Sequence, residues 1–184
     1  MQQTEKIIVL IGLMGAGKTS VGRKLANLIN MDFVDVDEEI SKAAGCSVED
    51  IFNKYGEDAF RDVEERVMAR LLNEKTRVLA TGGGAIMNPR TRKLVKACSI
   101  SVWLNADIEV LVQRTNKRGD RPLLKNKDHG NILKKLLKER GPVYAEADIC
   151  IDSSEDGPDV TAKNIMLALS ELSPLQARFI SNEK

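Results

Sequence analysis

Residues 12–19 read Gly-Leu-Met-Gly-Ala-Gly-Lys-Thr and complete the phosphate-loop pattern G-x-x-x-x-G-K-[ST]. A triphosphate carries several negative charges, so a protein that binds one needs close N–H donors, a cation and a place for Mg²⁺. Glycines let backbone amides approach phosphate oxygens, Lys18 supplies the cation, and the Thr19 hydroxyl can ligate Mg²⁺. The pattern therefore predicts that ATP and Mg²⁺ bind through Gly15, Ala16, Gly17, Lys18, Thr19 and Ser20.

Two carboxylates stand close together in the segment Phe33-Val34-Asp35-Val36-Asp37. Negative charge beside a phosphate loop is tolerable where a metal ion or a substrate proton uses it. Asp35 or Asp37 could instead cap the helix expected over residues 38–44, because aspartate is common at helix N-termini. The sequence leaves the functional and the capping interpretation open.

A run of three glycines follows Thr81, in the segment Thr81-Gly82-Gly83-Gly84. Glycines cost backbone entropy, so an ordinary turn rarely uses so many, and close approach of the backbone to a ligand is the better explanation. Many triphosphatases place an Asp for Mg²⁺ at the end of the corresponding strand, and this chain has none there. We therefore assign the carboxylate for the metal to Asp35.

Two charged stretches differ in character. Residues 57–75 mix acidic and basic side chains, which is typical of a solvated, salt-bridged helix face, although Arg61 stands out as a candidate site residue. Residues 114–130 are rich in basic residues and turn formers. A long basic loop between helices is usually either a mobile surface or a lid over an anion, and beside a phosphate loop we favour a lid over about residues 116–130.

These candidate residues need a scaffold, and apolar strand-like runs alternate with amphipathic helical stretches along the chain. We expect strands over residues 7–11, 32–36, 77–80, 98–104 and 149–151. We expect helices over residues 18–29, 38–44, 48–55, 57–73, 89–95 and 107–115. Such alternation predicts a parallel sheet covered on both faces, with ligands at the carboxyl ends of its strands.

Length and charge fit a single domain over residues 1–184 that binds small molecules. The chain has 28 Lys and Arg against 27 Asp and Glu, which argues against nucleic acid or a membrane surface as a general partner. Residues 1–6 have no signal-peptide pattern, so we expect a cytoplasmic protein, and we expect a monomer. Cys46, Cys98 and Cys150 are widely spaced, which predicts reduced, partly buried cysteines rather than a disulfide framework or a zinc site.

An ordered set of motifs resembles the shikimate kinase family over about residues 7–172. The set comprises residues 12–19, Asp35-Val36-Asp37, Glu57-x-x-Phe60-Arg61-x-x-Glu64, Gly82-Gly83-Gly84, Arg121-Pro122-Leu123-Leu124 and Arg140-x-x-x-Tyr144. The resemblance implies an α/β P-loop NTPase fold of the nucleoside-monophosphate-kinase type. That fold has a five-stranded parallel sheet in the order 2-3-1-4-5 flanked by helices, a substrate-binding region at about residues 33–64, and a lid.

The resemblance also implies a reaction and a nucleotide site. The γ-phosphoryl of ATP would pass to the 3-hydroxyl of shikimate, giving shikimate 3-phosphate and ADP on the chorismate route to the aromatic amino acids. Thr19 would ligate Mg²⁺ directly and Asp35 would hold it through water. Arg114 would stack near the adenine, and Arg121 would move in with the lid to stabilise charge on the transferring phosphoryl group.

On the acceptor side, the resemblance implies that Asp37 binds the substrate hydroxyls and could take the proton of the attacking one. Arg61 and Arg140 would grip the shikimate carboxylate, because a planar guanidinium matches a carboxylate in a fork. The glycine run, Gly82 to Gly84, would line the acceptor, with Gly83 donating its backbone N–H.

The chain departs from the family at residues 152–158, which are acidic where some members place an arginine beside the adenine. We therefore do not carry that contact over, and we assign no role to the tail, residues 173–184. A kinase of the same fold acting on gluconate or a nucleoside monophosphate would have less need of Asp37, Arg61 and Arg140 together. A non-catalytic regulatory domain of this fold would be expected to have lost Lys18, Asp35 or the lid arginine, and all of these are present.

Overall fold

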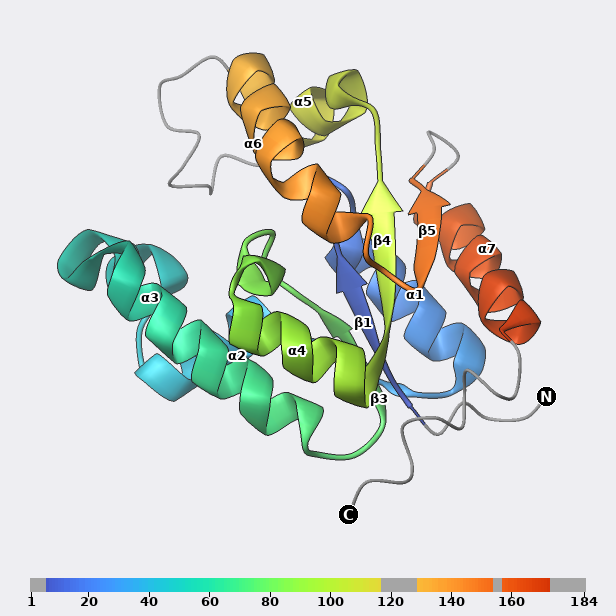
Figure 1. The fold of residues 1–184 in the computed structure, drawn as a ribbon, viewed down its shortest axis with the longest axis horizontal. Coiled ribbons are helices and arrows are strands. Elements are labelled where there is room, and N and C mark those ends of the chain that lie inside the picture. Colours follow the sequence, from blue (N-terminus) through green and yellow to red (C-terminus); the bar gives the residue numbers. More distant parts are fainter. Residues whose placement is uncertain (1–5, 117–128, 154–156, 173–184) are drawn as a thin grey trace.

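The computed structural model describes residues 6–116, 129–153 and 157–172 (Figure 1). Arg121, most of the predicted lid and the tail at residues 173–184 lie outside these ranges. The described strands form one parallel sheet in the order β2-β3-β1-β4-β5, as predicted. The strands are β1 (Ile7–Ile11), β2 (Asp32–Asp35), β3 (Arg77–Ala80), β4 (Ser99–Asn105) and β5 (Ile149–Asp152).

Helices cover both faces of this sheet (Figure 1). They are α1 (Lys18–Ile29), α2 (Val36–Ala44), α3 (Val48–Leu72), α4 (Pro89–Cys98), α5 (Ile108–Asn116), α6 (His129–Tyr144) and α7 (Pro158–Glu171), with a short 3₁₀ helix, η1 (Ala85–Met87). α1 and α7 pack against each other on one face, while α3 and α4 pack together on the other. α5 and α6 form a further pair above the carboxyl ends of the strands.

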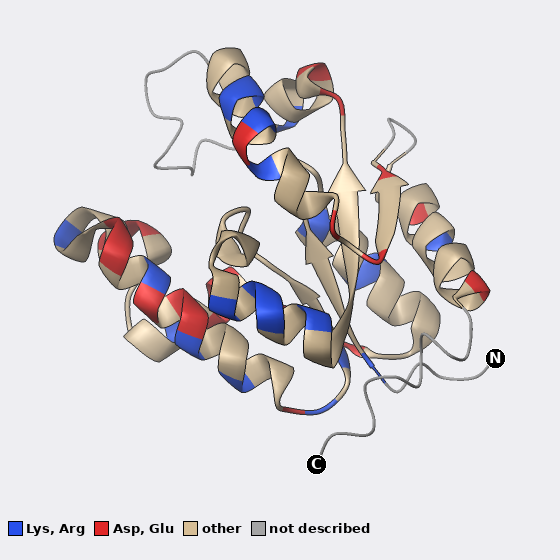
Figure 2. Ribbon diagram, in the orientation of Figure 1, with Lys and Arg blue, Asp and Glu red and all other residues tan. Residues whose placement is uncertain are grey.

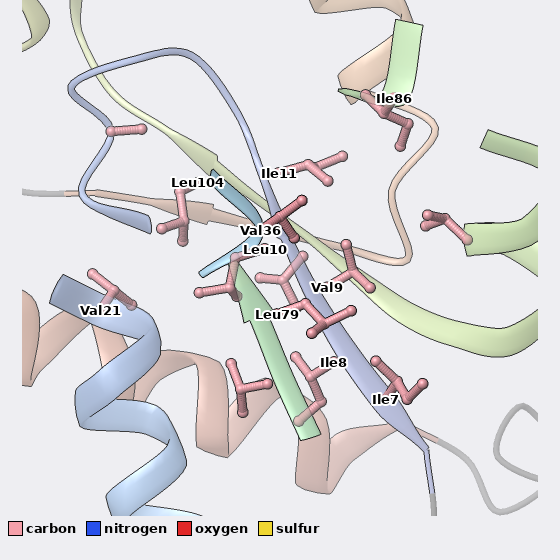
Figure 3. Packing of buried hydrophobic residues seen from close by; sticks show 14 of the residues in the cluster. Ile7, Ile8, Val9, Leu10, Ile11, Val21, Val36, Leu79, Ile86 and Leu104 are labelled. Atoms are coloured by element: carbon pink, nitrogen blue, oxygen red, sulfur yellow. The ribbon is translucent and has the colours of Figure 1, made fainter. Parts of the chain in front are cut away.

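β1 lies at the centre of the sheet, and all five of its residues are buried. A strand covered on both faces reads as a continuous apolar run, which is why Ile-Ile-Val-Leu-Ile is recognisable in the sequence. Figure 3 shows Leu10 on the side of Val21 from α1, and Ile11 on the side of Ile86 from η1. This buried strand fixes the position of the loop that follows it.

Two expectations about the elements need correction, while the predicted division of a helical stretch at Gly56 is confirmed. β2 ends at Asp35 rather than at residue 36, because α2 begins at Val36. The helices predicted over residues 48–55 and 57–73 follow each other as α3, with a break at Gly56, whose φ of 83° and ψ of 177° are not helical. α6 and α7 were not among the predicted helices, and α6 contains Pro142, a residue that argues against a helix interior.

The charged surface agrees with the prediction of a salt-bridged face. Figure 2 shows both signs of charge mixed along α3. Arg70 pairs with Glu39 at 2.8 Å and Arg90 pairs with Glu65 at 3.1 Å, which link α3 to its neighbours α2 and α4.

All three cysteines are unpaired, as predicted, although Cys150 is exposed rather than partly buried. Within the described ranges, no helix combines the length and the apolar character that crossing a membrane requires.

Candidate active site

The phosphate loop connects β1 to α1 and contains three glycines with positive φ, Gly12, Gly15 and Gly17. Gly12 has φ 135°, and a Cβ there would lie 2.6 Å from the Leu104 carbonyl oxygen, so no other residue fits. Gly17 has φ 90° and caps the N-terminus of α1. The loop therefore presents backbone amides and the positive end of the α1 dipole to the same point, which suits an anion.

Lys18, at the start of α1, is buried. Its Nζ donates hydrogen bonds to the carbonyl oxygens of Gly12, at 2.8 Å, and Leu13, at 2.9 Å. The ammonium is thus held inside the curve of the loop, where phosphate oxygens could compete with these carbonyls for its protons.

Asp35 has two roles in the structure. Its Oδ1 accepts a hydrogen bond from the Asp37 backbone N–H at 3.0 Å and so caps α2. Its Oδ2 accepts a hydrogen bond from the Thr19 hydroxyl at 2.8 Å. The capping interpretation is therefore right for Asp35 and wrong for Asp37, and capping leaves the second carboxylate oxygen beside Thr19.

A cavity of about 440 Å³ opens at the carboxyl ends of the strands. Of the predicted site residues, it is lined by Gly15, Gly17, Lys18, Thr19, Ser20, Asp35, Asp37, Gly82, Gly83 and Arg114. Ala16, Arg61, Gly84 and Arg140 are not part of its lining. The structure thus brings the phosphate loop, both aspartates and the glycine run to one place, with the two arginines next to it.

Arg61 lies against the glycine run from α3. Its guanidinium donates to Glu64 at 2.7 Å and to Glu57 at 2.9 Å. A Cβ on Gly84 would lie 2.5 Å from Nη2 of Arg61, so only glycine lets this guanidinium lie on the backbone.

Arg140 approaches the same run from α6. Its Nη1 would lie 3.6 Å from a Cβ on Gly83, and the Gly12 carbonyl oxygen would lie 3.4 Å from that Cβ. Two arginines far apart in the sequence therefore flank consecutive glycines, Gly83 and Gly84, beside the phosphate loop.

Glu64 lies in the family motif around Arg61, but the sequence interpretation gave it no role in the candidate site. Its side chain is only 3% exposed, and Oε1 has no hydrogen-bond partner among the described residues. Burial raises the pKa of this carboxyl, although Arg61 opposes the shift. A Cβ on Gly82 would lie 2.9 Å from Oε1 of Glu64 and 3.2 Å from Oδ1 of Asp37, so two carboxylates face one glycine.

The sequence interpretation gave Glu64 no role because Glu64 lies in a charged helical stretch, which is typical of a solvated face. Its spacing of three residues from Arg61 and its place in the same family motif pointed to a shared role.

Ser153 is a second residue to which the sequence interpretation gave no role. Its hydroxyl accepts a hydrogen bond from Arg114 at 3.0 Å and donates one to the Ala16 carbonyl at 2.9 Å. It is buried, and it lines the cavity. Ser153 thus joins the side chain predicted to lie near the adenine to the phosphate loop, and only its position directly after β5 could have suggested this.

The fold and this site define a P-loop kinase of the nucleoside-monophosphate-kinase type, with a phosphate loop after β1 and an acidic strand end at β2. A sequence model of the shikimate kinase family matches residues 14–170. The chain belongs to the shikimate kinase family and is an enzyme of the kinase class.

Two relatives illustrate the match. A shikimate kinase from Paramagnetospirillum magneticum is 50% identical over 164 residues, which cover 89% of this chain and 84% of that protein. The solved structure of the shikimate kinase from Acinetobacter baumannii in complex with shikimate superimposes with a TM-score of 0.88. It is 41% identical and covers 93% of this chain and 97% of its own.

The alternative of a gluconate kinase is not favoured. A gluconokinase from Sinorhizobium meliloti shares 18% identity with a TM-score of 0.60, covering 95% of this chain and 97% of its own. That likeness shows the fold alone.

Proposed function

We propose that this chain transfers the γ-phosphoryl of ATP to the 3-hydroxyl of shikimate, giving shikimate 3-phosphate and ADP on the chorismate route to the aromatic amino acids. The observation that carries the proposal is the pair of guanidinium groups, Arg61 and Arg140, beside the phosphate loop. A solved relative in complex with shikimate supports the same acceptor. Two arginines match one carboxylate, which shikimate has and a simple sugar lacks.

ATP binds with its phosphates on the amides of the loop, and Lys18 turns from the Gly12 and Leu13 carbonyls toward the β- and γ-phosphates. Ala16 contributes a backbone amide from the loop, and Ser20 contributes one from the first turn of α1. Arg114, held by Ser153, packs near the adenine.

The residues at the loop fit Mg²⁺. Thr19 and Asp35 offer oxygen atoms 2.8 Å apart, and no described group of three His, Cys, Asp or Glu side chains could form a closed metal cage. Mg²⁺ suits such a sparse oxygen site because it keeps several waters and takes phosphate oxygens as ligands. Thr19 would ligate the ion directly and Asp35 through water, and the ion would neutralise charge on the phosphates.

Shikimate binds between α3 and α6, with its carboxylate on Arg61 and Arg140 and the N–H of Gly83 as a further donor. Asp37 accepts the 3-hydroxyl's hydrogen bond and takes its proton as that oxygen attacks the γ-phosphorus. The bond from this phosphorus to the bridging oxygen breaks, and ADP leaves with the electron pair. Because Oε1 of Glu64 is an unused, buried acceptor, we place it toward the hydroxyl side of the substrate.

We retain the lid over about residues 116–130 as part of the proposal, with Arg121 stabilising the transferring phosphoryl group. Its described ends lie together, because Nδ1 of His129 is 2.5 Å from Oδ1 of Asn116. The Lys and Arg side chains between these two ends in the sequence would repel one another unless an anion lies beneath them. We also propose a monomeric enzyme of the cytoplasm, a compartment that suits three unpaired cysteines.

A coupled assay of ADP release tests this function with shikimate, quinate, gluconate and AMP supplied one at a time. We expect shikimate to support release at a kcat/KM far above that of the other three. Equal release with gluconate or AMP, or none with shikimate, would contradict the proposal.

A further inference from the structure

We propose that Tyr144 is a positioning residue for the acceptor, because it holds the glycine run in place between Arg140 and the phosphate loop. This inference rests on the proposed function, since the acceptor in its test is shikimate. Tyr144 belongs to the motif Arg140-x-x-x-Tyr144, in which only the arginine has a role in the proposed reaction.

Tyr144 is the last residue of α6, and its side chain is fully buried. Its hydroxyl donates a hydrogen bond to the Gly83 carbonyl oxygen. Its ring lies 5.9 Å from that of Trp103, centroid to centroid, with the planes tilted by 35°. The packed ring fixes the position of the hydroxyl, and the hydroxyl fixes the carbonyl.

Arg140 and Tyr144 are four residues apart on one helix and therefore share a face. Burial raises the pKa of the Tyr144 phenol, and the neighbouring Arg140 guanidinium opposes the shift. Arg140 and the Tyr144 hydroxyl that binds the glycine run are therefore fixed to the same helix, α6.

The tethered carbonyl matters because of what lies on each side of it. The Gly83 carbonyl and the Gly84 N–H belong to one rigid peptide plane. Gly84 supports the guanidinium of Arg61, while the Cα of Gly83 faces the Gly12 carbonyl and Arg140. A rotation of this plane would move the surface on which both arginines lie, but it would leave Lys18 and the α1 N-terminus in place.

The loss of the hydroxyl should therefore weaken acceptor binding and spare the nucleotide. Tyr144→Phe keeps the ring beside Trp103 and removes the hydroxyl donor from the part-buried Gly83 carbonyl. We expect KM and Kd for shikimate to rise by about fivefold or more, as for one lost hydrogen bond, with KM for ATP changed by less than about twofold.

Steady-state kinetics and calorimetric titration with shikimate, together with thermal unfolding, test this on the wild type, Tyr144→Phe and Tyr55→Phe. Tyr55 is 67% exposed on α3, and its variant should match the wild type in every measurement. A double-mutant cycle of Tyr144→Phe with Arg61→Lys should also be non-additive, because both residues act on the same peptide plane.

The inference is overturned by an unchanged shikimate KM, by equal rises in both KM values, or by a Tyr144→Phe variant that fails to fold, since each leaves Tyr144 with a structural role only. A wild type that does not phosphorylate shikimate would overturn the proposed function, and this inference with it. The wild-type assay therefore separates the two failures.

Discussion

Asp37 and Glu64 present their carboxylates to a single glycine, Gly82, and their surroundings differ. Glu64 is buried with one oxygen on Arg61, and the nearby charge of Asp37 adds to the rise in the pKa of Glu64. Asp37 lines the open cavity, where a substrate hydroxyl can reach it. The two carboxylates are thus suited to different tasks, one to hold an arginine and the other to meet the reacting hydroxyl.

Replacing Asp37 by Asn keeps the size of the side chain and removes its charge. If Asp37 takes the proton of the attacking hydroxyl, kcat should fall by about 10² or more, while the KM values change less. Initial rates at saturating ATP and shikimate measure this. A near-normal kcat would limit Asp37 to orienting the substrate.

Replacing Glu64 by Gln should release Arg61 and raise KM for shikimate by about tenfold, as expected for a lost hydrogen bond to a charged group. The free energy of unfolding should not fall in parallel with acceptor binding, because it depends on the protonation of Glu64. Because the folded state raises the pKa of Glu64, it favours the protonated carboxyl. Wild-type stability contributed by this group is therefore greatest at low pH and falls as pH rises through the folded pKa.

Glu64→Gln cannot ionise, so its unfolding free energy should gain on that of the wild type as pH rises from about 4 upward. Urea unfolding of both proteins across this range measures the difference. Parallel profiles for the two proteins would show that Glu64 does not titrate differently in the folded state.

At the level of elements, the fully buried strands were the most predictable part of the fold. β1 is apolar throughout and β3 is buried along its whole length, because helices cover both of their faces. β2 was predicted one residue too long, because Asp35 caps α2 and thereby ends the strand. The position of a capping residue does not show in the hydrophobic periodicity of the sequence. α6 was missed because Gly141 and Pro142 interrupt its pattern, although it carries Arg140 and Tyr144.

The candidate site was predictable wherever one short motif supplies several residues, as in the phosphate loop. It was less so where residues from distant elements meet. The contact of Ser153 with Arg114 and Ala16 joins the end of β5, α5 and the phosphate loop, and no local pattern encodes such a meeting.

Ser153→Ala should therefore weaken the nucleotide side of the site. With Arg114 and Ala16 both losing a partner, KM for ATP should rise by about fivefold, and KM for shikimate should hardly change. Ser170→Ala is the matched control, because that hydroxyl donates to the Leu167 carbonyl on an exposed part of α7. An unchanged KM for ATP in Ser153→Ala would show that ATP binding does not depend on the hydrogen bond from Arg114 to Ser153.

The proposed binding of the acceptor carboxylate between Arg61 on α3 and Arg140 on α6 can be tested in the same way. Arg61→Ala should cost about 2 to 5 kcal/mol of acceptor binding, or at least a thirtyfold rise in KM for shikimate, with little change for ATP. Arg66→Ala, on the solvated part of α3, controls for general loss of helix stability. Equal losses for both substrates in Arg61→Ala would indicate that α3 had been destabilised.

At the scale of the whole molecule, the proposed nucleotide and acceptor sides meet at the carboxyl ends of the sheet, where α5 and α6 lie close together (Figure 1). Residues 117–128 connect these helices in the sequence. If they close over bound substrates, Arg121 reaches the phosphoryl group and water is kept from competing with the acceptor.

Arg121→Ala should lower kcat by about 10³ or more and leave ATP binding nearly intact, because an arginine finger acts mainly on the transition state. Amide hydrogen exchange across residues 117–128 should also slow when ADP and shikimate are both bound. Exchange that ignores these ligands, or a normal kcat, would show that Arg121 is a surface residue.

The chemical identity of the product decides whether this protein phosphorylates shikimate at its 3-hydroxyl. The wild-type protein is incubated with ATP, Mg²⁺ and shikimate, and the product is examined by phosphorus NMR with correlation to the ring protons. We expect one phosphomonoester, coupled to the proton at carbon 3, formed in equal amount with ADP. Phosphorylation of another hydroxyl, or ADP formed with inorganic phosphate alone, would contradict it.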